Sequence, residues 1–137
     1  MATISRNKEH ELIMVCIYDA LTNISLGDQF SIEEMMENIF QTPFDNISLF
    51  AKQVVVKSLS HIDEIKAVYQ EKMPKWNFSR LNRLEQAILL MSYIHYQIEE
   101  KDSKRVIIDV AVRLAKKYLD ENDFKFVNAI LDNVLWI

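Results

Sequence analysis

The stretch VIIDVAVRLAKKYLDENDFKFVNAILDNV, residues 106–134, decides the fold of this chain. Apolar side chains recur in it at helical spacing, and they form two separate stripes: Ile107, Val110, Ala111, Leu114 and Tyr118, then Phe124, Val127, Ile130, Leu131 and Val134. A short acidic turn separates the two stripes. The pattern predicts two amphipathic helices, each of which buries one face against other helices.

One aromatic residue of this stretch is not explained by the stripes. Phe126 lies one position before Val127 of the second stripe, with Lys125 before it and Asn128 close behind. An aromatic ring at the edge of an apolar face, beside a cation and an amide, suits a site where a base stacks while its neighbours hold a phosphate. A ring packed in the core is the alternative interpretation, and the sequence leaves both open.

The composition indicates a single all-α domain spanning residues 1–137. Half of the 137 residues are hydrophobic, which is enough for a substantial core. One Gly and two Pro leave few residues suited to tight turns, and no segment alternates like a strand. The single cysteine, Cys16, excludes an internal disulfide, and its apolar neighbours predict a buried thiol. Without a secretory leader or a long apolar run, we expect a cytoplasmic protein that does not enter the membrane.

The chain lacks the residue patterns of most catalytic and metal sites. Its three histidines never stand at the spacing of a zinc helix, and a single Gly cannot form a phosphate-binding loop. We therefore expect no metal, no cofactor and no enzymatic activity. The net charge of −4 also argues against a generic basic nucleic-acid binder, although the eight acidic residues from Glu9 to Asp45 are segregated from most of the cations.

Helix start and stop signals predict five further helices before the two already described. Ser5, Ser31 and Ser79 are candidate N-caps, and Ser31 forms a capping box with Glu34. A charged break at residues 99–102 precedes the last pair. The predicted helices span about residues 6–23, 32–41, 45–60, 61–72 and 80–98.

The last two predicted helices resemble the C-terminal end of the NusB transcription antitermination family. That family has the pattern V-x-I-N-E-A-x-x-L-A-K, an acidic turn, and then F-V-N-G-x-L-D. The matching residues are Val106, Ile108, Ala111, Leu114, Ala115 and Lys116, followed by Phe126, Val127, Asn128, Leu131 and Asp132. Asp109, Val110 and Ala129 depart from the pattern. Trp76 and residues 80–89 are similar to the family's W-x-x-x-R-L-x-x-x-x-x-A-I-L helix, so the resemblance covers about residues 76–134.

The resemblance implies a fold of about seven helices in two packed three-helix bundles. It also implies an RNA-binding adaptor that, with the ribosomal protein NusE, binds boxA-like single-stranded RNA in ribosomal RNA operon transcripts and joins the transcription elongation complex. A homodimer is a further expectation. The residues carried over to RNA binding are Arg6, Lys8, His10, Tyr18, Lys116, Lys125 and Phe126, and those carried over to partner binding are Arg83, Glu85 and Asn122.

Two other interpretations remain open. Similar helical domains accompany some RNA-modifying enzymes, but we expect no catalytic domain after Ile137, and this expectation favours the adaptor. A protein interaction module with reduced RNA binding would suit the acidic first third, where only Arg6 and Lys8 represent the family's basic N-terminal motif.

Overall fold

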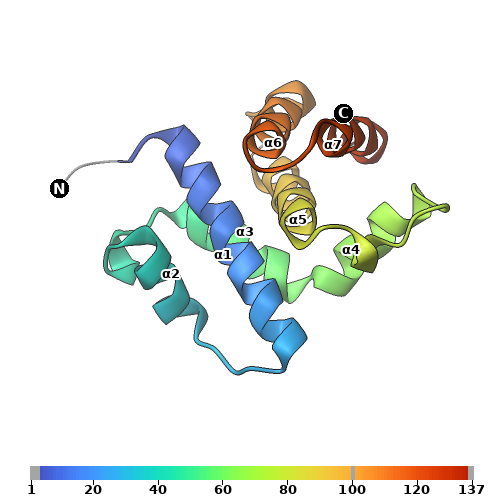
Figure 1. The fold of residues 1–137 in the computed structure, drawn as a ribbon. Helices are drawn as coiled ribbons and strands as arrows, with labels where there is room; N and C mark the ends of the chain where they lie inside the picture. Colours follow the sequence, from blue (N-terminus) through green and yellow to red (C-terminus); the bar gives the residue numbers. More distant parts are fainter. Residues whose placement is uncertain (1–3, 100, 136–137) are drawn as a thin grey trace.

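The computed structural model describes residues 4–99 and 101–135, and the regular secondary structure within them is entirely helical (Figure 1). The α-helices are α1 (Arg6–Leu26), α2 (Ile32–Phe40), α3 (Leu49–Ser60), α4 (Ile62–Glu71), α5 (Arg83–Ile98), α6 (Lys104–Tyr118) and α7 (Glu121–Val134). Two short 3-10 helices, η1 (Phe44–Asn46) and η2 (Phe78–Arg80), precede α3 and α5. The predicted all-α fold with seven helices is confirmed. In the part of the chain that the structure describes, no helix is both long and apolar enough to cross a bilayer.

Side-chain caps determine where most of these helices begin. The Ser5 and Ser31 hydroxyls accept backbone N–H groups three residues further on, as predicted. The third and fifth helices begin later than predicted, because Ser48 and Asn82 cap them. A helix start leaves several N–H groups without partners, and the polar side chain that satisfies them sets the boundary. The segments just before these caps form η1 and η2 instead.

Two other boundaries differ from the expectation. The first helix continues to Leu26 and ends where Gly27 adopts a left-handed φ of 71°. Tyr118, assigned to the inner stripe of the sixth helix, is 42% exposed at its C-terminal end, whereas the other four members of that stripe are buried. Glu100, part of the predicted charged break, lies outside the described residues.

Helix α5 is the central element of the fold. It packs against α1 and α3 on one side and against α6 and α7 on the other, while α2 contacts α1, and α4 contacts α5 and α7 (Figure 1). Its residues between Glu85 and Met91 are all buried. This arrangement agrees with two groups of helices that meet along α5. Cys16 of α1 is fully buried in this core, and burial raises the pKa of its thiol to about 12.

Tyr69→Phe is expected to lower the free energy of unfolding by about 1 kcal/mol. The ring of Tyr69 is fully buried between Phe78 and Tyr93, and its hydroxyl donates a hydrogen bond of 2.6 Å to the carbonyl of Leu89. The substitution removes this bond between α4 and α5 without changing the ring. Urea unfolding measures the effect. Tyr18→Phe, at an exposed ring, is the control, and equal stability of both variants would contradict the prediction.

Candidate nucleic-acid interface

The first turn of α1 presents a cation that is already held by the chain itself. Arg6 lies within ion-pair distance of Glu9 at 3.4 Å, Glu99 at 3.6 Å and Asp102 at 3.9 Å. Its guanidinium also stacks over the ring of Phe50, 4.1 Å from the centroid. Half of the Arg6 side chain remains exposed, so an incoming phosphate can reach it. Such a phosphate would have to displace or share these partners.

A second set of ion pairs joins α1 to the end of α6. Glu11 lies 3.5 Å from the Lys8 ammonium and 2.7 Å from the Lys117 ammonium. Hydrogen bonds from Lys117 and Tyr118 lower the pKa of Glu11, and the same contact with Glu11 raises the pKa of Lys117. Exposed ion pairs of this kind contribute little to the stability of a fold, because water and salt screen them. They therefore fix the position of the α6–α7 turn beside α1 without preventing exchange for phosphate.

His10 lies inside the protein, which differs from the expectation of a surface contact. The residue is 3% exposed, its ring stacks on His95 with centroids 5.4 Å apart, and neither ring nitrogen has a hydrogen-bond partner among the described residues. Burial, and next the nearby His95, lower the pKa of His10 to about 4. His10 is therefore neutral at physiological pH. It packs α1 against α5 and has no surface from which to contact RNA.

His95 has a polar partner that His10 lacks. Its Nε2 lies 2.8 Å from Asp102, the same carboxylate that faces Arg6. Burial lowers the pKa of His95, although Asp102 acts in the opposite direction. The cluster of His10, His95, Phe50, Arg6 and Asp102 thus connects α1, α3 and the segment between α5 and α6.

The entrance to α7 brings Phe126 to the surface beside a second aromatic ring. Phe126 is partly buried against the core, and its ring centroid lies 5.8 Å from that of Trp76. Lys125 pairs with Glu121 at 3.0 Å. The Lys116 ammonium lies 5.1 Å above the ring of the neighbouring Phe124. The ring of Phe126 therefore packs partly against the core and remains partly accessible at the surface.

Tyr18 lies apart from the other residues assigned to RNA. Its ring is 40% exposed on α1. At 1.5 Å per residue it stands about 18 Å along the helix from Arg6. A nucleotide at Tyr18 would therefore be several positions away from one at Arg6 along an extended strand.

Of the three residues assigned to a protein partner, Glu85 is buried and the other two are not. Arg83 donates a hydrogen bond of 3.2 Å to the Thr22 hydroxyl and so ties the start of α5 to α1. Asn122 is exposed in the first turn of α7. Glu85 is 3% exposed, and burial, with a contribution from Asp123, raises the pKa of its carboxyl to about 7. Glu85 differs from the expectation, because it joins α5 to α7 instead of facing a partner.

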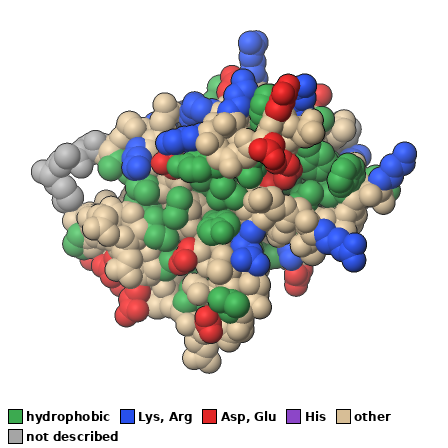
Figure 2. Space-filling view, in the orientation of Figure 1, with side chains coloured by type: hydrophobic (Ala, Val, Ile, Leu, Met, Phe, Trp, Pro, Cys, Tyr) green, Lys and Arg blue, Asp and Glu red, His purple; other side chains and the backbone are tan. Residues whose placement is uncertain are grey.

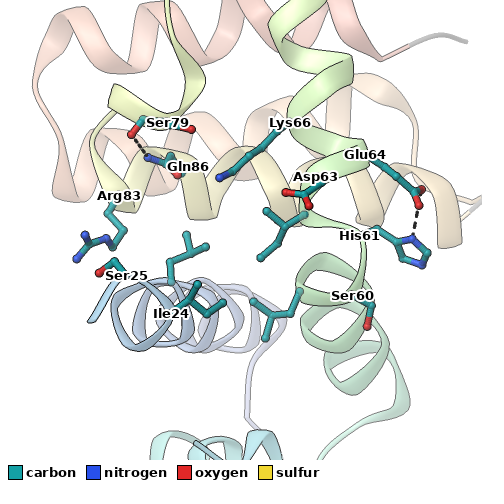
Figure 3. A pocket seen from close by; sticks show the side chains of 13 residues that line it. Ile24, Ser25, Ser60, His61, Asp63, Glu64, Lys66, Ser79, Arg83 and Gln86 are labelled. Carbon is teal, nitrogen blue, oxygen red and sulfur yellow. Dashed lines mark hydrogen bonds and ion pairs between the residues drawn. The ribbon is translucent and has the colours of Figure 1, made fainter. Parts of the chain in front are cut away.

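Arg83 also lines a cavity of about 610 Å³ at the end of α1 (Figure 3). The cavity is bounded by the α3–α4 junction and by η2 with the start of α5. The cations Lys66 and Arg83 and the carboxylates Asp63 and Glu64 all line the cavity, and Glu64 pairs with His61 at 3.3 Å. This mixed charge gives the cavity no preference for phosphate. Across the described residues, no three His, Cys, Asp or Glu side chains are placed to hold a metal ion.

A profile of the NusB family matches residues 7–135 of the chain. The chain belongs to the NusB family. Two curated NusB transcription antitermination proteins are similar over most of its length. That of Treponema denticola is 34% identical over 119 residues, 86% of this chain and 79% of its own. That of Finegoldia magna is 32% identical over 131 residues, 96% of this chain and 93% of its own. The family predicted from the C-terminal motif is confirmed.

Solved structures show the same NusB fold. The Thermotoga maritima NusB structure superposes with a TM-score of 0.79 at 19% identity, covering 98% of this chain and 92% of that one. A structure of NusB and NusE in complex with double-stranded RNA gives a TM-score of 0.76 at 21% identity and covers 95% of both chains. At this level of identity, these similarities concern the fold alone.

Proposed function

We propose that this member of the NusB family is an RNA-binding transcription antitermination factor that binds boxA-type single-stranded RNA together with NusE. The contact between Lys117 and Glu11 carries the proposal, because it holds the end of α6 beside α1 and so brings the two predicted RNA segments to one side. The relatives named as antitermination proteins, and the neighbouring structure that contains NusE and RNA, support the same role.

The proposed RNA contacts are the surface members of the predicted set. Arg6, Lys8, Lys116 and Lys125 supply positive charge, while Tyr18 and Phe126 supply rings for unpaired bases. The buried His10 is left out. The ion pairs of Arg6 and Lys8 with the chain's own carboxylates reduce the charge available to phosphate, so binding by this chain alone is expected to be modest.

Arg83 and Asn122 remain the proposed contacts for NusE, while Glu85 holds the helices behind them. The adaptor is proposed to be a single domain over residues 1–137, to work in the cytoplasm within the elongation complex, and to perform no catalysis. Self-association into a homodimer also remains a prediction. The alternative with a specific observation in its favour is an interaction module with reduced RNA binding, because Arg6 has three carboxylate neighbours.

Substitution of both Arg6 and Lys8 by Ala is expected to weaken binding of a boxA-type oligoribonucleotide and to flatten its salt dependence. Each phosphate contact to a single strand contributes about 0.7 to the slope of log affinity against log salt concentration. Loss of two contacts should therefore reduce the slope by about 1.4. Fluorescence anisotropy titrations at several salt concentrations measure both quantities.

Lys57→Ala is the matched control, since Lys57 is an exposed cation on α3, outside the proposed site. Because Arg6 also packs on Phe50, thermal unfolding of the double variant must accompany the titration. The single substitution Lys8→Ala leaves the contact between Arg6 and Phe50 intact. Unchanged affinity and slope in properly folded variants would favour the interaction module.

A further inference from the structure

Trp76 is the most exposed aromatic side chain among the described residues. It lies between α4 and η2, is 60% exposed, and faces Phe126 of α7 with the ring planes inclined at 54°. Figure 2 shows hydrophobic side chains gathered on the surface where α7 meets the segment that follows α4. The two rings come from positions fifty residues apart in the sequence, and they meet at the entrance to α7 where the proposed RNA site ends.

The segment that carries Trp76 is held in place by the protein. The backbone N–H of Trp76 donates to the carbonyl of Met73 at 3.0 Å. The side-chain amide of Gln70 donates to the carbonyls of Met73 and Trp76, and its oxygen accepts the N–H of Phe78 at 3.0 Å. Because Phe78 is buried, this network anchors the loop to the core. The backbone that carries the indole is therefore held in place, which lowers the entropic cost of stacking.

Two exposed cations flank the indole. Lys75 and Arg80 line the same cavity of about 770 Å³ as Trp76, together with the amides of Asn77 and Asn82. Neither cation forms an ion pair with a carboxylate of the described residues. In this they resemble Lys116 and differ from Arg6, Lys8 and Lys125, so the surface beside Trp76 carries positive charge that no carboxylate of the described residues pairs with.

The acidic residues at this end of α7 have partners of their own. Glu121 is paired with Lys125. Glu85 and Asp123 lie at the edge of the cavity in hydrogen-bond contact with each other, and the raised pKa of Glu85 reduces the negative charge of this pair near neutral pH. The repulsion that they exert on a phosphate at Lys75 or Arg80 is correspondingly weak.

We propose that Trp76 and Phe126 form a composite stacking site for one unpaired base of single-stranded RNA, with Lys75 and Arg80 binding the adjacent phosphates. The inference rests on the proposed function and extends its RNA site from α7 across to the segment between α4 and η2. Flat exposed rings beside cations and amides match the way single strands are held. Two rings offer a small apolar area, which suits a base better than a protein partner.

The test uses the full chain and a boxA-type oligoribonucleotide that carries a 2-aminopurine, whose fluorescence falls when it stacks. Trp76→Ala is expected to weaken binding about tenfold or more and to restore the fluorescence, whereas Trp76→Phe should retain most of both. Lys75→Ala and Arg80→Ala should each reduce the salt slope by about 0.7. Leu49→Ala, at another exposed apolar residue, and Lys57→Ala are the matched controls.

The outcomes separate this inference from the function on which it rests. If Arg6 and Lys8 substitutions weaken binding but Trp76→Ala does not, the proposed function stands and the stacking site is overturned. If the native chain binds no RNA, with or without NusE, both are overturned. Loss of NusE binding in Trp76→Ala with unchanged RNA affinity would assign the rings to the protein partner and also overturn the inference. Thermal unfolding confirms that each variant is folded.

Discussion

Glu85→Gln is expected to stabilise the folded protein by up to about 3 kcal/mol near pH 8 and to change its stability little near pH 5. Burial, with Asp123 opposite, raises the pKa of the Glu85 carboxyl from 4.5 to about 7. The folded state therefore keeps a proton that the unfolded state releases above pH 4.5. This contribution to stability is complete below pH 4.5 and is lost as the pH rises through 7. Gln has nearly the same shape as Glu but carries no charge, so Glu85→Gln removes this loss of stability at high pH.

Urea unfolding at a series of pH values from 5 to 8 measures this effect. The relevant quantity is the difference between Glu85→Gln and the native protein at each pH, because a packing change would contribute equally at all of them. Glu71→Gln, at the exposed end of α4, is the matched control. A stabilisation by Glu85→Gln that is equal at pH 5 and pH 8 would contradict the assignment of a protonated carboxyl.

His10→Phe is expected to remove a pH dependence of opposite sign. Burial beside His95 lowers the pKa of His10 from 6.5 to about 4, so the unfolded state binds a proton in this range that the folded state does not. The contribution of His10 to stability is complete above pH 6.5 and is lost as the pH falls through 4. Between pH 7.5 and pH 5 the loss amounts to about 2 kcal/mol. Phe retains a flat ring against His95 without nitrogens that titrate.

The two dependences oppose each other in the native protein. Between pH 7.5 and pH 5, Glu85 favours the folded state increasingly and His10 favours it less, by comparable amounts. The contributions of Glu85 and His10 to the pH dependence of stability therefore largely cancel in this range, and each substitution unbalances them in its own direction. His61→Gln, at an exposed histidine, serves as the control. A His10→Phe protein that keeps the native profile would contradict the low pKa of His10.

The helices and their buried faces follow from periodicity, and this is why the C-terminal pair could be predicted in detail. Ile107, Val110 and Leu114 are buried as their spacing indicates. Helix starts were predicted less well. Several Ser and Asn side chains precede α3 and α5, and which of them caps the helix depends on how the preceding segment packs. The 3-10 turns η1 and η2 take up the first residues of the predicted helices: Asp45 and Asn46 in one case and Arg80 in the other.

Two residues that were carried over from the family resemblance as surface contacts, His10 and Glu85, are buried. His10 nevertheless precedes Ile13 by three positions, Met14 by four and Ile17 by seven, and all of these are buried on the same face of α1. Glu85 stands in the same relation to Ile88 and Leu89 of α5. The periodicity thus contained the signal for burial, but the cost of burying an ionisable group argued against it. The shifted pKa values lower this cost, because they favour the protonated, neutral form of Glu85 and the deprotonated, neutral form of His10.

The approach of Trp76 to Phe126 was not predictable from the sequence. It depends on how α4 and α7 pack against α5, and no local pattern encodes a contact between residues so far apart in the chain. Trp76 entered the sequence argument only as part of a resemblance. Its exposure, and the lack of ion pairs at Lys75 and Arg80, became evident only from the structure.

The interactions of Arg6 make phosphate capture at this end of α1 an exchange of partners. One guanidinium holds Phe50 of α3 and the carboxylates of Glu99 and Asp102, which lie between α5 and α6. A nucleic acid that binds Arg6 in place of these partners would also remove the ion pairs that hold this connecting segment to α1. The Asp102 carboxylate would then retain only its contact with His95. Binding of a phosphate at the first turn of α1 and loosening of the adjoining α5–α6 connection would then be a single event.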